Sequence, residues 1–284
     1  MPRQNRIGTK FETLAKKGEG ALICYVVAGY PDIKTSECVI DSLVAGGADM
    51  IEIGIPFSDP IADGRTIQAA CNYALEKGTI PEDAMRLARN IRKKYPGLPL
   101  LFMTYSNILL RTGVDEFVEK SKNCGVDGFI IPDMPVDEAQ SYVAAASQQD
   151  LMTVFLASPN TSPERLSSIL ACTSGFLYLV SVFGITGARK SFEDYTRVAV
   201  KNARMAAGKI PLAVGFGIST PDHARYMMAA GADAVIVGSA ILDRIAIMGR
   251  GKADMLHKIE KFARSMKKAC RRQLAGRQST SFHN

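Results

Sequence analysis

Residues 21–27, Ala-Leu-Ile-Cys-Tyr-Val-Val, form an apolar run without a charged side chain. Similar runs recur at 49–53, 98–103, 127–131, 151–156, 176–181, 210–214 and 233–237. Between them lie stretches with helical periodicity, such as 34–45, 81–95, 135–149, 192–206 and 220–229. Apolar strands that alternate with helix-length segments indicate a parallel sheet that is buried on both faces.

Eight strand–helix units within about 250 residues match a (β/α)8 barrel, the TIM-barrel fold, better than an open doubly wound sheet. We expect an extra helix at about 6–17, before the first strand. Added helices are expected within 60–80, after the second strand, and at 251–272, after the eighth. No break in composition suggests a second domain, so residues 1–272 are predicted to form one domain, followed by a basic, mobile tail at 273–284.

A short motif marks three of the joins between a helix and the next strand. It occurs as Gly47-Ala48-Asp49, Gly125-Val126-Asp127 and Gly231-Ala232-Asp233. Glycine accepts the left-handed conformation that commonly ends a helix, so each motif is expected to end one helix before a strand begins. These turns belong to the face of a barrel that serves stability, and we expect the chemistry at the opposite end.

The charge of the chain is concentrated near its C-terminus. The 284 residues carry a net charge of +7, and residues 252–284 hold nine Lys or Arg against two acids, which equals the whole excess. We interpret this as the solvated face of the last helix and a basic tail, with contact to a polyanion as the alternative. No nucleic-acid partner is therefore predicted.

The cysteines and histidines suggest neither a disulfide framework nor a metal site. Six cysteines are scattered without a Cys-x-x-Cys pair, and three histidines stand alone. This pattern is typical of reduced thiols in a cytoplasmic protein. No apolar run reaches the ~20 residues that span a bilayer, and the N-terminus lacks the apolar segment of a signal peptide. We therefore expect no membrane segment.

Two acids lie in the stretch Ile-Glu-Ile-Gly-Ile-Pro-Phe-Ser-Asp-Pro-Ile-Ala-Asp-Gly at 51–64. Glu52 falls within a strand, where burial raises the pKa of a carboxyl group and suits it to proton transfer near neutral pH. Asp63 falls on the following loop, close to the mouth of the predicted barrel. The pattern alone leaves two interpretations open: a catalytic pair, or a paired barrel residue at 52 and a helix N-cap at 63.

Glycine-bearing loops follow the sixth, seventh and eighth predicted strands. They contain Gly184, Gly187, Gly215, Gly217 and Gly238, the last followed by Ser239. TIM barrels often bind phosphate with backbone N–H groups of the late loops and a helix N-terminus. A phosphate site is therefore predicted, with ordinary turn chemistry as the alternative.

Three tyrosines lie in or just after predicted strands, at Tyr25, Tyr105 and Tyr178. Together they suit a pocket for an aromatic substrate, although core packing explains any one of them alone.

Several of these segments, in this order and spacing, resemble the tryptophan synthase alpha chain family over about residues 6–270. They are Glu52 to Gly64, Pro132-Asp133-Met134-Pro135, Gly184-Ile185-Thr186-Gly187, Gly215-Phe216-Gly217-Ile218-Ser219 and Gly238-Ser239. The segment Pro-Phe-Ser-Asp-Pro-x-Ala-Asp-Gly is highly specific for that family. The resemblance implies a TIM-barrel lyase of tryptophan biosynthesis that cleaves indole-3-glycerol phosphate into indole and glyceraldehyde 3-phosphate.

The resemblance also implies roles for individual residues. Glu52 would be the acid–base group, and Asp63 would stabilise the charge that develops on the indole nitrogen. The substrate-binding residues carried over are Tyr25, Tyr178, Thr186, Gly187, Phe216, Gly217, Gly238 and Ser239. Among them, Tyr25 would be a wall of the indole pocket, Tyr178 and Thr186 would position the substrate and close the sixth loop around Asp63, and the others would bind phosphate.

A partner is implied as well. The family's beta chain receives indole through a tunnel within an αββα complex, and the loops at 54–64 and 104–112 would lie near the interface. Pyridoxal phosphate belongs to the beta chain, so no cofactor is expected here. Two departures bear on this partnership: Arg65 and Ile108 each stand where family members often have proline.

Three alternatives remain open at this stage. Another phosphosugar-binding barrel, such as an isomerase of histidine biosynthesis, would share the phosphate loops, but such enzymes place their acids on the first and fifth strands. A free-standing lyase would release indole without a beta chain. A non-catalytic barrel is suggested only by the basic tail.

Overall fold

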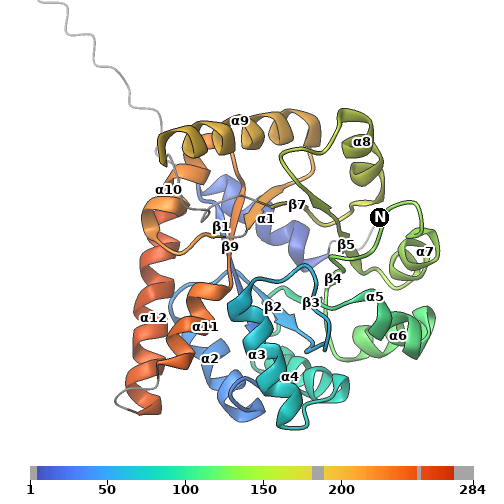
Figure 1. Cartoon of the computed structure of the whole chain (residues 1–284), viewed down its shortest axis with the longest axis vertical. Helices are drawn as coiled ribbons and strands as arrows, with labels where there is room; N and C mark the ends of the chain where they lie inside the picture. Colours follow the sequence, from blue (N-terminus) through green and yellow to red (C-terminus); the bar gives the residue numbers. More distant parts are fainter. Residues whose placement is uncertain (1–4, 181–188, 216, 248–250, 272–284) are drawn as a thin grey trace, which may run out of the picture.

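The computed structural model describes residues 5–180, 189–215, 217–247 and 251–271. These residues form a parallel sheet surrounded by helices (Figure 1). The strands are β1 (Ala21–Val27), β2 (Met50–Gly54), β3 (Leu100–Met103), β4 (Gly128–Ile130), β5 (Met152–Val154), β6 (Leu156–Ala157), β7 (Leu177–Val180), β8 (Leu212–Gly215) and β9 (Ala234–Val237). Their order in the sheet is β5-β4-β3-β2-β1-β9-β8-β7-β6.

The fifth predicted strand is present in two parts, because Phe155 separates β5 from β6. β5 pairs with β4 at one end of this order, and β6 pairs with β7 at the other. Since β5 and β6 are consecutive in the chain, their connection closes the sheet into a barrel. The predicted (β/α)8 fold is thus confirmed, with its fifth strand divided.

Twelve helices are found among the described residues. They are α1 (Arg6–Lys16), α2 (Ile33–Ala45), α3 (Arg65–Glu76), α4 (Pro81–Lys94), α5 (Ser106–Thr112), α6 (Val114–Asn123), α7 (Gln140–Gln148), α8 (Pro163–Cys172), α9 (Arg189–Ala207), α10 (Pro221–Ala230), α11 (Ser239–Ala246) and α12 (Lys252–Ala269). The extra helix before β1 and the added helices after β2 and β9 are as predicted. The short α5, directly after β3, has no counterpart in the prediction. The tail at 273–284 lies outside the described residues.

The Gly-x-Asp motifs end helices as predicted. Gly47, Gly125 and Gly231 have φ angles of 99°, 84° and 111°, in the left-handed region that glycine adopts without strain. The aspartates of these motifs have a further role that the sequence did not suggest, because each one joins the starts of two neighbouring strands. The acid and leucine partners are Asp49 with Leu22, Asp127 with Leu100, and Asp233 with Leu212.

In each pair the two residues exchange hydrogen bonds. The carboxylate accepts from the leucine N–H, at 2.8 Å for Asp49 and 2.9 Å for the other two. The aspartate N–H donates to the leucine carbonyl, at 2.7–2.8 Å. A serine takes the place of the acid between β5 and β7, where Ser174 exchanges two bonds with Thr153, one through its Oγ at 2.9 Å. The same exchange of hydrogen bonds therefore recurs at four of the eight junctions between neighbouring strands of the barrel, counting β5 and β6 as one divided strand.

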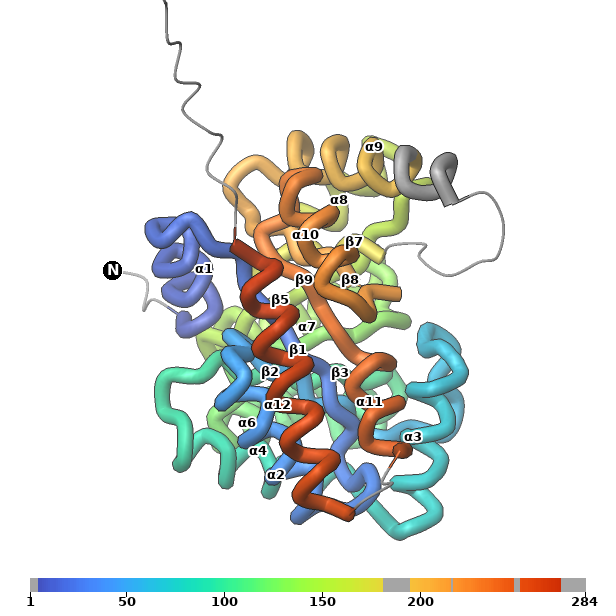
Figure 2. Tube along the Cα trace, turned by 90° about the vertical axis from the view of Figure 1, so that its left-hand side faces the viewer, coloured from blue at the N-terminus to red at the C-terminus, as the bar shows by residue number. Residues whose placement is uncertain are grey.

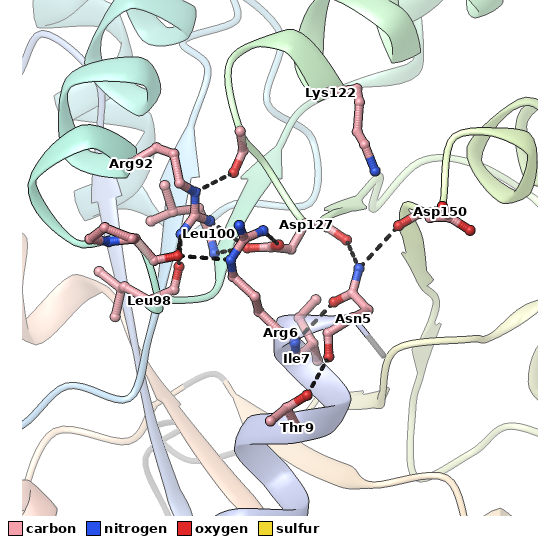
Figure 3. A network of polar contacts seen from close by, with 12 residues as sticks. Asn5, Arg6, Ile7, Thr9, Arg92, Leu98, Leu100, Lys122, Asp127 and Asp150 are labelled. Atoms are coloured by element: carbon pink, nitrogen blue, oxygen red, sulfur yellow. Dashed lines mark hydrogen bonds and ion pairs between the residues drawn. The ribbon is translucent and has the colours of Figure 1, made fainter. Parts of the chain in front are cut away.

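A cation accompanies each aspartate. Lys267 of α12 lies 2.8 Å from Asp49, Arg92 of α4 lies 2.6 Å from Asp127, and Arg204 of α9 pairs with Asp233. Arg92 also donates to the backbone carbonyls of Tyr95, Pro96, Leu98 and Gly125. Figure 3 shows Arg92 beside Leu98 and Asp127. Neutral Ser174 has no charge to balance.

Helices α1 and α12 fix the chain ends at the same face of the barrel. Asn5 Nδ2 donates to the carbonyls of Asp127 and Asp150, and Arg6 pairs with Asp127 at 2.9 Å (Figure 3). Figure 2 shows α12 running along the outside of the barrel, where it packs against α2 and α10. Both helices therefore contact the strand starts, and the strand ends lie at the opposite face of the barrel.

Candidate active site

Glu52 lies in the middle of β2, in register with Tyr25 on β1 and Leu101 on β3. It is only 1% exposed, and its Oε1 has no hydrogen-bond partner within the described part of the chain. Burial raises the pKa of Glu52 to about 8, so the carboxyl group is mostly protonated at neutral pH. The interpretation of Glu52 as a paired barrel residue is therefore not supported.

Asp63 lies on the loop that follows β2 and is 7% exposed. The Tyr105 hydroxyl donates to its Oδ2 at 2.9 Å, while its Oδ1 is buried without a partner among the residues described. Burial raises the pKa of Asp63 to about 6, and the hydrogen bond from Tyr105 limits the rise. The N-cap of α3 is Gly64, so the alternative role of Asp63 as a helix cap is wrong.

Tyr25 and Tyr178 each lie against a glycine of the next strand. A Cβ atom added to Gly54 would lie 2.2 Å from the Tyr25 hydroxyl, and one added to Gly215 would lie 2.2 Å from the Tyr178 hydroxyl. Burial, and then the nearby negative charges that include Glu52 and Asp63, raise the pKa of both phenols well above the ordinary value. Both tyrosines therefore share one site with the two acids.

The predicted phosphate residues are described only in part. Gly217 has a φ of 73°, and Gly238 is the N-cap of α11, which begins at Ser239. They follow β8 and β9, which are neighbours in the barrel. The predicted site residues Thr186, Gly187 and Phe216 lie outside the described residues.

Comparisons of this chain with known proteins all point to one family. The family model described as tryptophan synthase alpha chain matches residues 11–271. The tryptophan synthase alpha chain of Methanosarcina barkeri is 45% identical over 272 residues, which cover 96% of this chain and 99% of that protein. The chain belongs to the tryptophan synthase alpha chain family.

Solved structures show the same relationship. The alpha subunit from Legionella pneumophila is 34% identical with a TM-score of 0.86, and the match covers 94% of this chain and 98% of that one. A chain in a structure of tryptophan synthase from Mycobacterium tuberculosis is 34% identical with a TM-score of 0.84, and the match covers 95% and 99%. The resemblance seen in the motifs is thus confirmed over nearly the whole alpha-chain sequence.

Two residues that lie beside the candidate site residues were not predicted as part of the site. The sequence suggested Tyr105 only as one of three aromatic side chains, whereas the structure joins its hydroxyl to Asp63. The position of Tyr105 directly after β3, which pairs with β2, is the sequence feature that could have indicated a contact with the loop after β2. Cys71 lies on the buried face of α3, and burial raises the pKa of its thiol to about 12, an effect that the nearby Phe57 N–H and Tyr25 hydroxyl partly offset. Nothing in the sequence indicated this position.

A groove of about 760 Å³ lies beside the site. It is lined by the loop after β2, including Pro56 and Phe57, and by Asn107, Ile108 and Arg111 of α5. Phe57 stacks on Tyr105 with ring centroids 5.2 Å apart, so the groove wall and Asp63 contact the same tyrosine. Arg65, the departure at the start of α3, is exposed.

Within the described ranges, no cluster of three or more His, Cys, Asp or Glu side chains could hold a metal ion. Over the same ranges, no helix is both long and apolar enough to cross a membrane.

Proposed function

We propose that Glu52 and Asp63 are the catalytic groups with which this chain cleaves indole-3-glycerol phosphate, the lyase reaction of the tryptophan synthase alpha family. One observation carries the assignment. Two buried carboxyl groups, one on β2 and one on the loop after it, each keep an oxygen without a partner among the described residues. Buried polar atoms are nearly always paired, so an unpaired oxygen in each acid favours a ligand as its partner.

The reaction requires two proton movements. Protonation of carbon 3 of the indole ring puts positive charge on the ring nitrogen, and cleavage follows when the adjacent side-chain hydroxyl loses its proton and becomes the aldehyde. Glu52, with its raised pKa, can give the first proton and accept the second. Asp63 Oδ1 accepts the ring N–H and stabilises the developing charge, while Tyr105 holds Oδ2 in place.

The phosphate end is assigned to the loops after β8 and β9. Gly217 and Gly238 allow close approach to the backbone, and Ser239 opens a helix whose N-terminus favours an anion. Tyr178 is assigned to the substrate pocket because it lies against Gly215 on β8. The assignments of Thr186, Gly187 and Phe216 rest on the family resemblance alone.

The partner we propose is the tryptophan synthase beta chain, in an αββα complex. Exposed apolar side chains border the loop and groove beside the site: Ile61 is 80% exposed, Leu110 60% and Ile80 52%. Such a surface suits burial against another protein. No cofactor is proposed for this chain, because pyridoxal phosphate would belong to the beta chain. The free cysteines are typical of a reducing compartment, which supports a cytoplasmic location.

The test is an assay of indole release from indole-3-glycerol phosphate, with the purified chain alone and with a beta chain. Release that the beta chain increases would support both the reaction and the partner. Equal release in both cases would favour the free-standing lyase. Absence of indole in both cases would refute the proposed reaction and favour another phosphosugar enzyme.

A further inference from the structure

Four side chains form one side of the site, and we call them the Tyr25 cluster: Tyr25, Cys71, Tyr105 and Asp63. All four are buried. The Tyr25 hydroxyl lies close enough to the Cys71 thiol to affect the pKa of that thiol, and the Tyr105 hydroxyl donates to Asp63. Cys71 reaches the cluster from α3, which packs against β1. The cluster therefore joins strand, helix and loop beside one catalytic acid.

The position of the Tyr25 ring is fixed by the backbone on both sides. Its hydroxyl lies so close to Gly54 that a Cβ there would come within 2.2 Å. On the other side, a Cβ on Gly238 would come within 3.2 Å of the ring atom Cδ1. The phenol has no room to move towards either strand, so its hydroxyl and the thiol beside it form a rigid boundary.

The substrate meets this boundary through Asp63, a step that rests on the proposed function. Tyr105 occupies Oδ2, so Oδ1 is the oxygen left for the indole N–H. The carbon of the six-membered ring nearest that N–H is carbon 7, and a substituent there projects to the same side as the N–H. It would therefore point towards the members of the cluster next to Asp63.

We propose that Tyr25 and Cys71 determine substrate specificity by excluding indole rings that carry a substituent at carbon 7. The atoms that would exclude the substituent are the phenol oxygen of Tyr25 and the sulfur of Cys71. Tyr25→Phe removes the oxygen, and Cys71→Ala removes the sulfur. A single methyl group in a close-fitting pocket changes kcat/KM by about 10- to 200-fold. Loss of either atom should therefore raise kcat/KM for an indole with a methyl group at carbon 7.

The reverse reaction provides the assay. Indole and glyceraldehyde 3-phosphate condense with formation of one carbon–carbon bond, as carbon 3 loses a proton and the aldehyde oxygen gains one. Indole, 5-methylindole and 7-methylindole are compared, and the measured quantity is the ratio of kcat/KM for the 7-methyl compound to that for the 5-methyl compound. Wild type, Tyr25→Phe, Cys71→Ala and the control Tyr142→Phe are tested. Tyr142 is a buried phenol between α7 and the sheet, outside the cluster.

The expected result is a ratio at least about tenfold higher in Tyr25→Phe and in Cys71→Ala than in wild type, with no change in Tyr142→Phe. Thermal unfolding shows whether each variant folds. If Tyr25→Phe does not fold, the ratio measured for Cys71→Ala alone tests the proposal. A ratio within twofold of wild type in the folded variants overturns the proposal. Failure of wild type to condense unsubstituted indole would instead refute the proposed function.

Discussion

The hydroxyl of Tyr105 holds one oxygen of Asp63 at 2.9 Å and leaves the other oxygen buried without a partner in the described part of the chain. A carboxylate held in this way presents a single oxygen in a fixed direction. Positioning of this kind is a large part of the catalytic effect of a charged group.

Tyr105→Phe should lower kcat by about tenfold, less than the ~10²- to 10⁴-fold effect of a group that transfers the proton itself, because Tyr105 only positions Asp63. The hydrogen bond from Tyr105 lowers the pKa of Asp63, which is about 6, so its loss moves that pKa upward. The acid limb of the pH–rate profile, along which activity falls as Asp63 gains a proton, should therefore shift to higher pH. Measurement of kcat between pH 5 and 9 checks this, and an unchanged acid limb would contradict it.

Glu52→Gln should reduce cleavage by about 10²- to 10⁴-fold, while binding of glyceraldehyde 3-phosphate persists. Single-turnover measurements of indole formation test the loss. The control is Glu138→Gln, since Glu138 is exposed. Near-normal turnover of Glu52→Gln would exclude Glu52 as the proton carrier.

The same substitution should stabilise the fold above acidic pH. The pKa of Glu52 is about 8 in the folded chain and near 4.5 when unfolded, so the unfolded state releases its proton first. Stability of the wild type is lost as pH rises from about 4.5 to 8, by up to about 5 kcal/mol in total. Glu52→Gln should therefore show a growing gain in free energy of unfolding over this range in urea titrations. An equal gain at pH 4 and pH 8 would contradict the assignment.

Gly238→Asp should raise KM for indole-3-glycerol phosphate by about tenfold or more, because a carboxylate would repel the phosphate. Gly238→Ala is the control, because it adds a side chain without a charge and so shows how much of the rise in KM is steric. Its Cβ would lie 3.2 Å from the Tyr25 ring, a tight contact that predicts a smaller effect. Equal KM values in wild type and Gly238→Asp would show that the phosphate binds elsewhere.

Arg92→Met should lower the free energy of unfolding by about 3–5 kcal/mol, because it leaves Asp127 buried without its closer cation. The Arg92 side chain is 13% exposed and that of Asp127 3%. Lys94→Met on the same helix is the matched control, since the Lys94 side chain is 48% exposed in its pair with Asp41, and solvent screens exposed ion pairs so that they contribute little to stability. Similar losses in the two variants would contradict the special role of Arg92.

The sequence predicted the barrel because its apolar runs and glycine-ended helices are local patterns. It also predicted that Glu52 is buried, because Glu52 stands out as a charge within an apolar strand. The Tyr105 contact with Asp63 depends on how two neighbouring strands are aligned, which periodicity does not reveal. Cys71 was missed for a similar reason, since its neighbours come from β1 and from the loop after β2. The ambiguity between catalytic acid and helix cap at Asp63 could be resolved only by the start of α3 at Arg65.

The recurrent hydrogen-bond exchange at the strand starts has a consequence for the role of the last helix. Arg92 precedes Leu100, and Arg204 precedes Leu212, by the same interval, so each of these helices brings the cation to the strand pair that follows it. The first pair receives Lys267 from α12, at the far end of the chain, and the Gly20 N–H bonds to the Cys270 carbonyl at 2.7 Å, just before β1. Helix α12 thus supplies to the first strand pair the cation that α4 and α9 supply to theirs. The last helix is therefore part of the first strand pair, so a chain cut before Lys267 would leave Asp49 without this cation.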